Sequence, residues 1–154
     1  MKTKFKIEQL TGSGGIIMGL SLPFAIIGII LNVLFPQWFK MNTGMPGIII
    51  GAVFLVLGIP FWLVSLVQML RYVPQNKLIT KGPFRIMLHP IYTSVALLVI
   101  PGLTLVLDTW IGFGIGIILY IISRIFRIQE EKKLEDCFSE EYKAYRSVVL
   151  IPWL

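Results

Sequence analysis

Three long stretches without a charged side chain, residues 16–35, 47–70 and 91–107, constrain this chain more than any other feature. A fourth apolar stretch, residues 110–126, contains its first charge at Arg124. At ~1.5 Å per residue, the first stretch alone is long enough to cross a hydrocarbon layer of ~30 Å. Hydrophobic residues make up 56% of the chain and charged residues only 14%. We therefore predict an all-α, polytopic membrane protein with four transmembrane helices in a single domain, residues 1–154.

The positions of the cations predict how the spans are oriented. Of the 14 lysines and arginines, only Lys40 lies in a loop on the side opposite the N-terminus, which itself carries Lys2, Lys4 and Lys6. Cations concentrate on the cytoplasmic side of membrane proteins. We therefore expect both termini in the cytoplasm, with the cell membrane as the location. The net charge of +6 then reflects topology and affinity for membrane lipid rather than for nucleic acid.

Two kinds of residue within the apolar stretches predict local packing. The pairs Gly15/Gly19, Gly47/Gly51 and Gly112/Gly116 have the four-residue spacing that lets helices approach closely. Pro101-Gly102 predicts a break in the third span.

The segment 81–92 contains the only histidine, His89, at the point where a polar loop meets the third apolar stretch. Gly82-Pro83 is typical of a turn, and His89-Pro90 of a helix start, because proline is well accepted in a first turn. The free amides of that turn would suit an anionic group. With one histidine and one cysteine, Cys137, we expect no metal site.

The end of the fourth span is charged. Arg124 lies inside the expected hydrocarbon layer or near its cytoplasmic edge, where an ionisable residue either serves function or extends to the head groups. From Arg127 the chain becomes a charged amphipathic helix that we expect on the cytoplasmic side. Leu134, Phe138 and Tyr142 follow one another at four-residue spacing, and Glu130 and Glu131 stand near its start.

The order of these motifs resembles that of the isoprenylcysteine carboxyl methyltransferases, to which membrane phospholipid methyltransferases are related. The resemblance covers residues 78–152. It rests on Thr-Lys-Gly-Pro-Phe at 80–84, His-Pro-x-Tyr at 89–92, Gly102, Glu-Glu-x-x-Leu at 130–134, Phe-x-Glu-Glu-Tyr-x-x-Tyr at 138–145 and Pro152.

The resemblance implies an integral membrane enzyme that transfers a methyl group from S-adenosylmethionine to a lipophilic acceptor, such as the carboxylate of an isoprenylcysteine. It implies a cofactor site in residues 78–152, and it implies that Arg124 contacts the acceptor. The residues that it assigns to the cofactor are Gly82, His89, Pro90, Tyr92, Gly102, Glu130 and Glu131.

The chain departs from the family pattern at three positions. Leu88 stands where the family commonly has arginine, and Ser94 and Ser139 stand where it has glycine. Arg85, one helical turn before Leu88, could supply the missing cation.

Two other functions fit part of the pattern. A sterol-reductase-like membrane enzyme that uses NADPH has a similar C-terminal outline, although no additional basic cluster for a 2′-phosphate is present. A non-catalytic four-helix membrane protein is the other alternative. Neither the acceptor nor the oligomeric state follows from the sequence.

Overall fold

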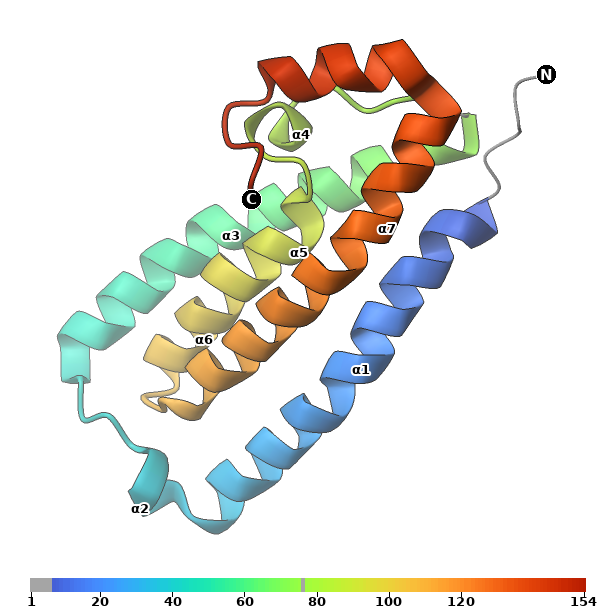
Figure 1. The fold of residues 1–154 in the computed structure, drawn as a ribbon. Helices are drawn as coiled ribbons and strands as arrows, with labels where there is room; N and C mark the ends of the chain where they lie inside the picture. Colours follow the sequence, from blue (N-terminus) through green and yellow to red (C-terminus); the bar gives the residue numbers. More distant parts are fainter. Residues whose placement is uncertain (1–6, 76) are drawn as a thin grey trace.

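A computed structural model describes residues 7–75 and 77–154, with side chains described from residue 16 onward. The lysines that precede residue 7 lie outside the described residues. Within those residues the regular structure is helical (Figure 1). The elements are α1 (Ile7–Leu34), α2 (Pro36–Phe39), α3 (Gly44–Tyr72), a 3₁₀ turn (Val73–Gln75), α4 (Pro83–Ile86), α5 (Pro90–Ser94), a π-helical turn (Val95–Val99), α6 (Ile100–Val106) and α7 (Ile111–Val148).

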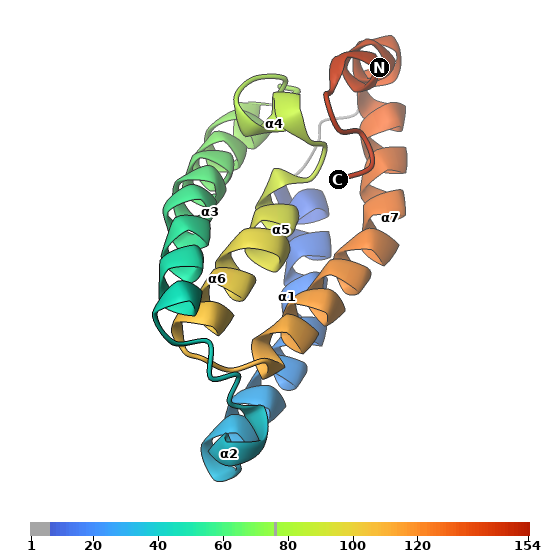
Figure 2. The same cartoon turned by 90° about the vertical axis from the view of Figure 1, so that its left-hand side faces the viewer.

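The apolar stretches of the sequence form a bundle of parallel and antiparallel helices. By length and composition, three helical stretches can cross a membrane, namely Ile16–Leu34, Gly44–Gln75 and Ile111–Val148. A shorter apolar stretch, Pro90–Val106, corresponds to the third predicted span. It lies between α3 and α7, and α1 packs on α7 (Figures 1 and 2). The predicted all-α fold is confirmed, with the third of the four predicted spans the shortest.

The outer surface of the bundle is apolar. Met18, Val33 and Val56 are each 70% exposed. A continuous cover of such side chains is unfavourable in water but matches the hydrocarbon of a bilayer.

The third span is continuous, and the predicted break at Pro101-Gly102 is wrong. The π-helical turn directly precedes Pro101, and the Ile100 amide donates a hydrogen bond to the Val95 carbonyl, five residues earlier. Proline lacks an amide and crowds the preceding turn, so widening that turn lets the helix continue. The backbone therefore runs from Pro90 to Val106 without a break.

Gly51, Gly112 and Gly116 allow close helix crossings as predicted, whereas the prediction is wrong for Gly47, which faces Thr43 at the start of its own helix. A Cβ atom on Gly51 would lie 2.7 Å from the Gly102 carbonyl, and one on Gly116 would lie 2.9 Å from the Ala96 carbonyl. The prediction is also wrong for Gly19, which has open space around it. The surroundings of Gly15 lie outside the part of the chain whose packing the structure describes.

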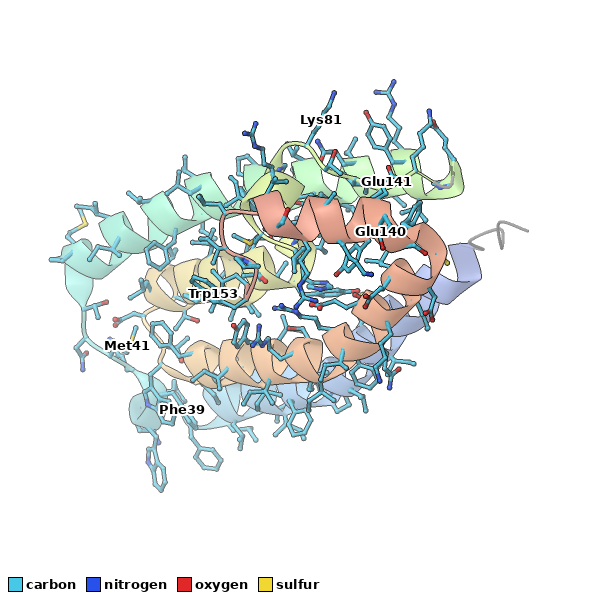
Figure 3. All side chains as sticks on the ribbon, turned by 45° about the horizontal axis from the view of Figure 1, so that its top comes forward. Phe39, Met41, Lys81, Glu140, Glu141 and Trp153 are labelled. Carbon is cyan, nitrogen blue, oxygen red and sulfur yellow. The ribbon has the colours of Figure 1, made fainter. Side chains whose placement is uncertain are left out.

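A polar contact joins the two loops at one end of the bundle. The Asp108 carboxylate accepts hydrogen bonds from the Thr43 amide and hydroxyl, each at 2.8 Å, and from the Asn42 amide at 3.2 Å. These donors hold the pKa of Asp108 below its usual value. The loops therefore lie together, and Figure 3 shows Phe39 and Met41 at the opposite end from Lys81.

At the other end, α7 extends past the bundle and bends at Ser139, whose φ of 41° and ψ of −111° are not helical. The predicted amphipathic helix is thus a continuation of the fourth span, and its last part lies across the end of the bundle (Figure 1). Tyr142, Tyr145 and Val149 pack there against Leu88. Partly buried apolar side chains surround this cluster, namely Leu78, Phe84, Leu134 and Phe138.

The C-terminal segment then pairs with the loop before the third span. The Leu150 amide donates to the Arg85 carbonyl at 3.1 Å, and the Ile151 amide donates to the Ile86 carbonyl at 2.9 Å. The last residue, Leu154, accepts a hydrogen bond from the Leu88 amide at 3.1 Å. The backbone on either side of His89 is therefore fixed before the third span begins.

Candidate active site

His89 lies at the start of the third span. Its φ of −123° and ψ of 62° are not helical, and Pro90 occupies the first helical position, as the sequence predicts. Proline disfavours a helical conformation in the residue before it, so the helix begins after His89. The imidazole is thereby turned toward α7, and its side chain is only 11% exposed.

Two consecutive carboxylates of α7 contact this imidazole. His89 Nδ1 lies 3.3 Å from Glu130 Oε2, and His89 Nε2 lies 3.5 Å from Glu131 Oε1. The second approach is not directed as a hydrogen bond, so the buried Nε2 has no hydrogen-bonding partner. His89 therefore keeps one nitrogen available for a further group.

The charges around His89 favour its protonated form. Burial alone would lower the pKa of His89, but the adjacent carboxylates of Glu130 and Glu131 outweigh burial and raise the pKa. For Glu131, burial would raise the pKa, but His89, Arg127 and Arg146 together lower it to about 2. The contacts therefore stabilise the imidazolium form of His89 beside the carboxylate form of Glu131.

Two arginines hold Glu131 from another direction. Arg127, one helical turn earlier, donates from Nε to Glu131 Oε1, and Arg146 Nη1 lies 3.2 Å from Oε2. Arg127 also donates to the carbonyls of Trp153 at 2.8 Å and Pro152 at 2.6 Å. Because so many groups fix Glu131, its position relative to His89 is well defined.

A mainly apolar cavity of about 100 Å³ opens beside His89 at the end of the bundle. That volume is several times what a single water molecule needs. Its lining residues are Met69, Val73, Lys77, Leu78, Ile79, Phe84, Leu88, His89, Pro90, Ile91, Tyr92, Glu130, Leu134, Phe138, Tyr142 and Tyr145.

The tyrosines of the cavity differ in their hydrogen bonds. The Tyr145 hydroxyl donates to the Phe84 carbonyl at 2.6 Å, whereas the buried Tyr142 hydroxyl has no hydrogen-bonding partner. Burial raises the pKa of Tyr142 to about 12, so it stays protonated. A buried hydroxyl without a partner is costly unless a ligand satisfies it. This cavity therefore has the character of a binding site.

The cavity brings together most of the residues that the sequence assigned to the cofactor. His89, Pro90, Tyr92 and Glu130 line it, and Glu131 contacts His89 from outside the lining. This convergence joins the start of the third span to α7, 41 positions away in the chain.

Three assigned residues lie apart from the cavity. Gly82, with φ 62°, precedes α4 and faces Gln68, because a Cβ atom there would lie 2.8 Å from the Gln68 amide nitrogen. Gly102 lies at the crossing with Gly51. Arg124 donates to the Trp153 carbonyl and stacks over Tyr120, 5.9 Å from the ring centre.

The position of the missing family arginine is apolar here. Leu88 is 6% exposed and packs in the cluster with Tyr142 and Tyr145. Arg85 is exposed and does not line the cavity.

Sequence reasoning missed Tyr142 and Arg127 as site residues. The four-residue spacing of Leu134, Phe138 and Tyr142 was visible, but it indicated only an apolar helix face. The contact of Arg127 with the C-terminal segment had no signal in the sequence, because it depends on the bend at Ser139.

The fold and the cavity define a class of protein, an integral membrane protein with a cavity at one end of its spans. A family model described as phospholipid methyltransferase matches residues 20–141, and the chain belongs to this family. It is thus a membrane methyltransferase, of a family related to the isoprenylcysteine carboxyl methyltransferases that its motifs resemble. The comparisons with curated proteins and with solved structures found no match.

Proposed function

We propose that this protein transfers a methyl group from S-adenosylmethionine to a lipophilic acceptor at the cytoplasmic face of the cell membrane. The observation that carries the proposal is the position of His89 between Glu130 and Glu131, beside a cavity at the end of the membrane spans.

The residues of the cavity fit the cofactor. S-adenosylmethionine combines a flat apolar base, ribose hydroxyls and a charged amino-acid end with a methyl group activated by a sulfonium. Phe84 and Phe138 offer apolar walls for the base. The Glu130 carboxylate can accept from hydroxyls or an ammonium, and the unpartnered Tyr142 hydroxyl can pair with a polar group of the ligand.

The electrostatics of His89 suggest a binding role. Because its pKa is raised, the imidazole has more cationic and hydrogen-bond donor character than a free histidine. Its available Nε2 can donate to an anionic group such as the cofactor carboxylate. For an amine acceptor, His89 or Glu130 is the candidate base, since both line the cavity. A carboxylate acceptor needs no base at all.

Exclusion of water and positioning can supply much of the rate, since the methyl carbon is already activated. The segment 150–154 pairs with the backbone of residues 85–89, and the last part of α7 lies across the same end of the bundle (Figure 2). Arg124 is our proposed residue for orienting the acceptor, through the donors that its bond to the Trp153 carbonyl leaves free.

Two acceptor classes fit this chemistry, a carboxylate such as that of an isoprenylcysteine and a phospholipid amine. The family favours a lipid, and the motifs resemble those of enzymes that act on the carboxylate. The cation asymmetry of the loops supports a cytoplasmic opening, with both termini on that side.

The test is transfer of a labelled methyl group by the purified protein in lipid nanodiscs. Phosphatidylethanolamine and a farnesylated cysteine serve as alternative acceptors, and NADPH oxidation is followed in parallel. We expect methyl transfer to one acceptor and no NADPH oxidation. Absence of S-adenosylmethionine binding by calorimetry, with the protein folded, would overturn the proposal.

A further inference from the structure

A second hollow lies outside the cavity and shares no lining residue with it. We call it the basic hollow, and its lining residues are Arg127, Lys143, Arg146, Ser147, Pro152 and Trp153. Three of these six side chains are cations and none is a carboxylate. Two carboxylates, Glu131 and Glu140, pair with these three cations, so the group as a whole keeps an excess of positive charge.

The bend at Ser139 creates this hollow. Arg127 precedes the bend, and Lys143 and Arg146 follow it, so a straight helix would hold them far apart. Lys143, Arg146 and Ser147 share one helix face by their three- and four-residue spacing. An adjacent face packs into the apolar cluster through Tyr142, Tyr145 and Val149, and Figure 3 shows Trp153 on the neighbouring C-terminal segment.

The cations of the hollow retain unused capacity for an anion. The Lys143 ammonium, 58% exposed, contacts only Glu140 at 3.1 Å, and the Arg146 side chain, 49% exposed, contacts Glu131 at 3.2 Å. The Lys143–Glu140 pair is exposed on both sides, and ion pairs of this kind are weak and exchange partners readily. Arg146 keeps its contact with the half-buried Glu131 and offers its remaining guanidinium donors. Phosphate oxygens match both an ammonium and the planar guanidinium fork.

The surroundings of the hollow indicate that the anion belongs to a lipid. Trp153 is 64% exposed although it lines the hollow with three cations, and Leu150, on the same C-terminal segment, is 73% exposed. Tryptophan with apolar neighbours is typical of the head-group layer of a membrane. Arg124, at the end of the fourth predicted span, reaches the Trp153 carbonyl, so the hollow lies near the level where the span ends.

We propose that the basic hollow binds the phosphate of an anionic membrane lipid, at a site separate from the cavity beside His89. The proposal requires only the membrane location of the chain and is independent of methyl transfer. Because Arg127 and Arg146 also hold Glu131, a lipid bound here would contact groups that position the site at His89.

The test is calorimetric titration of the purified full chain in a non-ionic detergent. Three probes are compared: short-chain phosphatidylglycerol, phosphatidylcholine of the same chain length, and glycerol 3-phosphate. We expect saturable binding of phosphatidylglycerol that weakens with salt, and binding of the other two at least about tenfold weaker, since the site needs both an anionic head group and acyl chains.

Lys143→Gln is the informative variant, because Lys143 is exposed and touches neither His89 nor the cavity. Removing one cation near a membrane should weaken phosphatidylglycerol binding roughly fivefold. Lys133→Gln is the matched control, with the same charge change on an exposed position of α7 outside the hollow, and it should leave the affinity unchanged.

Two results would overturn the proposal. Equal affinity for glycerol 3-phosphate would show a site for free phosphate rather than for lipid. Equal affinities of Lys143→Gln and Lys133→Gln for phosphatidylglycerol would show that the basic hollow is not where the lipid binds.

Discussion

Nδ1 of His89 lies 3.3 Å from Oε2 of Glu130, and this contact joins the start of the third span to the charged part of α7. The two residues are 41 positions apart in the chain, so no local structure brings them together. The contact exists because α5 begins at Pro90 and because α7 continues past the bundle instead of ending at its surface.

Glu130→Ala should weaken S-adenosylmethionine binding. Loss of one charge-assisted hydrogen bond costs ~1.5–3 kcal/mol, which is about ten- to a hundredfold in affinity. Calorimetry on the purified variant measures this, with Glu141→Ala as a control, since Glu141 is exposed and lies outside the cavity. Equal cofactor affinity of the two variants would show that Glu130 does not bind the cofactor.

Glu131→Ala should differ from Glu130→Ala in stability. It leaves Arg127 and Arg146 without their shared carboxylate and His89 with only one acidic neighbour. We expect both weaker cofactor binding and a lower unfolding temperature. An unfolding temperature equal to that of the parent would mean that the network around Glu131 contributes nothing to the fold.

Stability should depend on pH on both sides of neutrality. The pKa of His89 is raised, so its contribution is complete below its ordinary value near 6.5 and is lost as pH rises through the raised value. The pKa of Glu131 is lowered from 4.5 to about 2, so its contribution is present above 4.5 and is lost as pH falls toward 2.

Unfolding temperatures of the parent and of His89→Gln across this range provide the measurement. The variant should lack the decline on the alkaline side. If the unfolding temperature of the variant still falls at alkaline pH, a group other than His89 causes the fall.

Ser139→Gly should stabilise the protein. Ser139 has a φ of 41°, which side-chain-bearing residues rarely adopt and glycine adopts readily. Relief of such strain is worth ~1–3 kcal/mol, partly offset by the greater entropy of glycine in the unfolded chain, so we expect a net gain of about 1 kcal/mol.

Ser147→Gly is the control, because Ser147 lies in a regular part of α7, where glycine is unfavourable. It should lower the unfolding temperature. If both substitutions are destabilising, the bend does not strain Ser139.

Arg124→Lys distinguishes two roles of this arginine. If the guanidinium orients the acceptor, lysine keeps the charge but loses the planar fork, so kcat/KM for the acceptor should fall with cofactor affinity unchanged. Arg124→Leu should lose nearly all turnover. If Arg124 only anchors the Trp153 carbonyl, both variants should be less stable yet turn over normally at matched cofactor occupancy.

Cysteine labelling tests the predicted orientation. In a Cys137→Ser background, Lys40→Cys and Leu107→Cys lie in the two loops that Asp108 joins. Both should react with an impermeant reagent from outside the cell, and Glu141→Cys should react only after permeabilisation. Labelling of all three from the same side would contradict the topology.

The sequence by itself determined the fold class and the residues on which the site depends. Long uncharged stretches must be helical in a bilayer, because backbone groups have no other partners there. Pro90 determined where the third span begins. The motifs around His89 and the Glu130-Glu131 pair determined the family, since their order along the chain does not depend on how the helices pack.

Only the tertiary structure decided which of these residues meet. Gly102 belongs to the same motif set as His89, yet it lies at a helix crossing, because its lack of a side chain serves close packing there. The motifs assign Arg124 to the acceptor, but its contact with the Trp153 carbonyl depends on the chain folding back at Ser139. The φ and ψ angles of Ser139 determine where the C-terminal segment lies, and no periodicity in the sequence predicts these angles. Contacts between distant segments follow from the sum of such local bends and packing choices, so they become visible only in the folded chain.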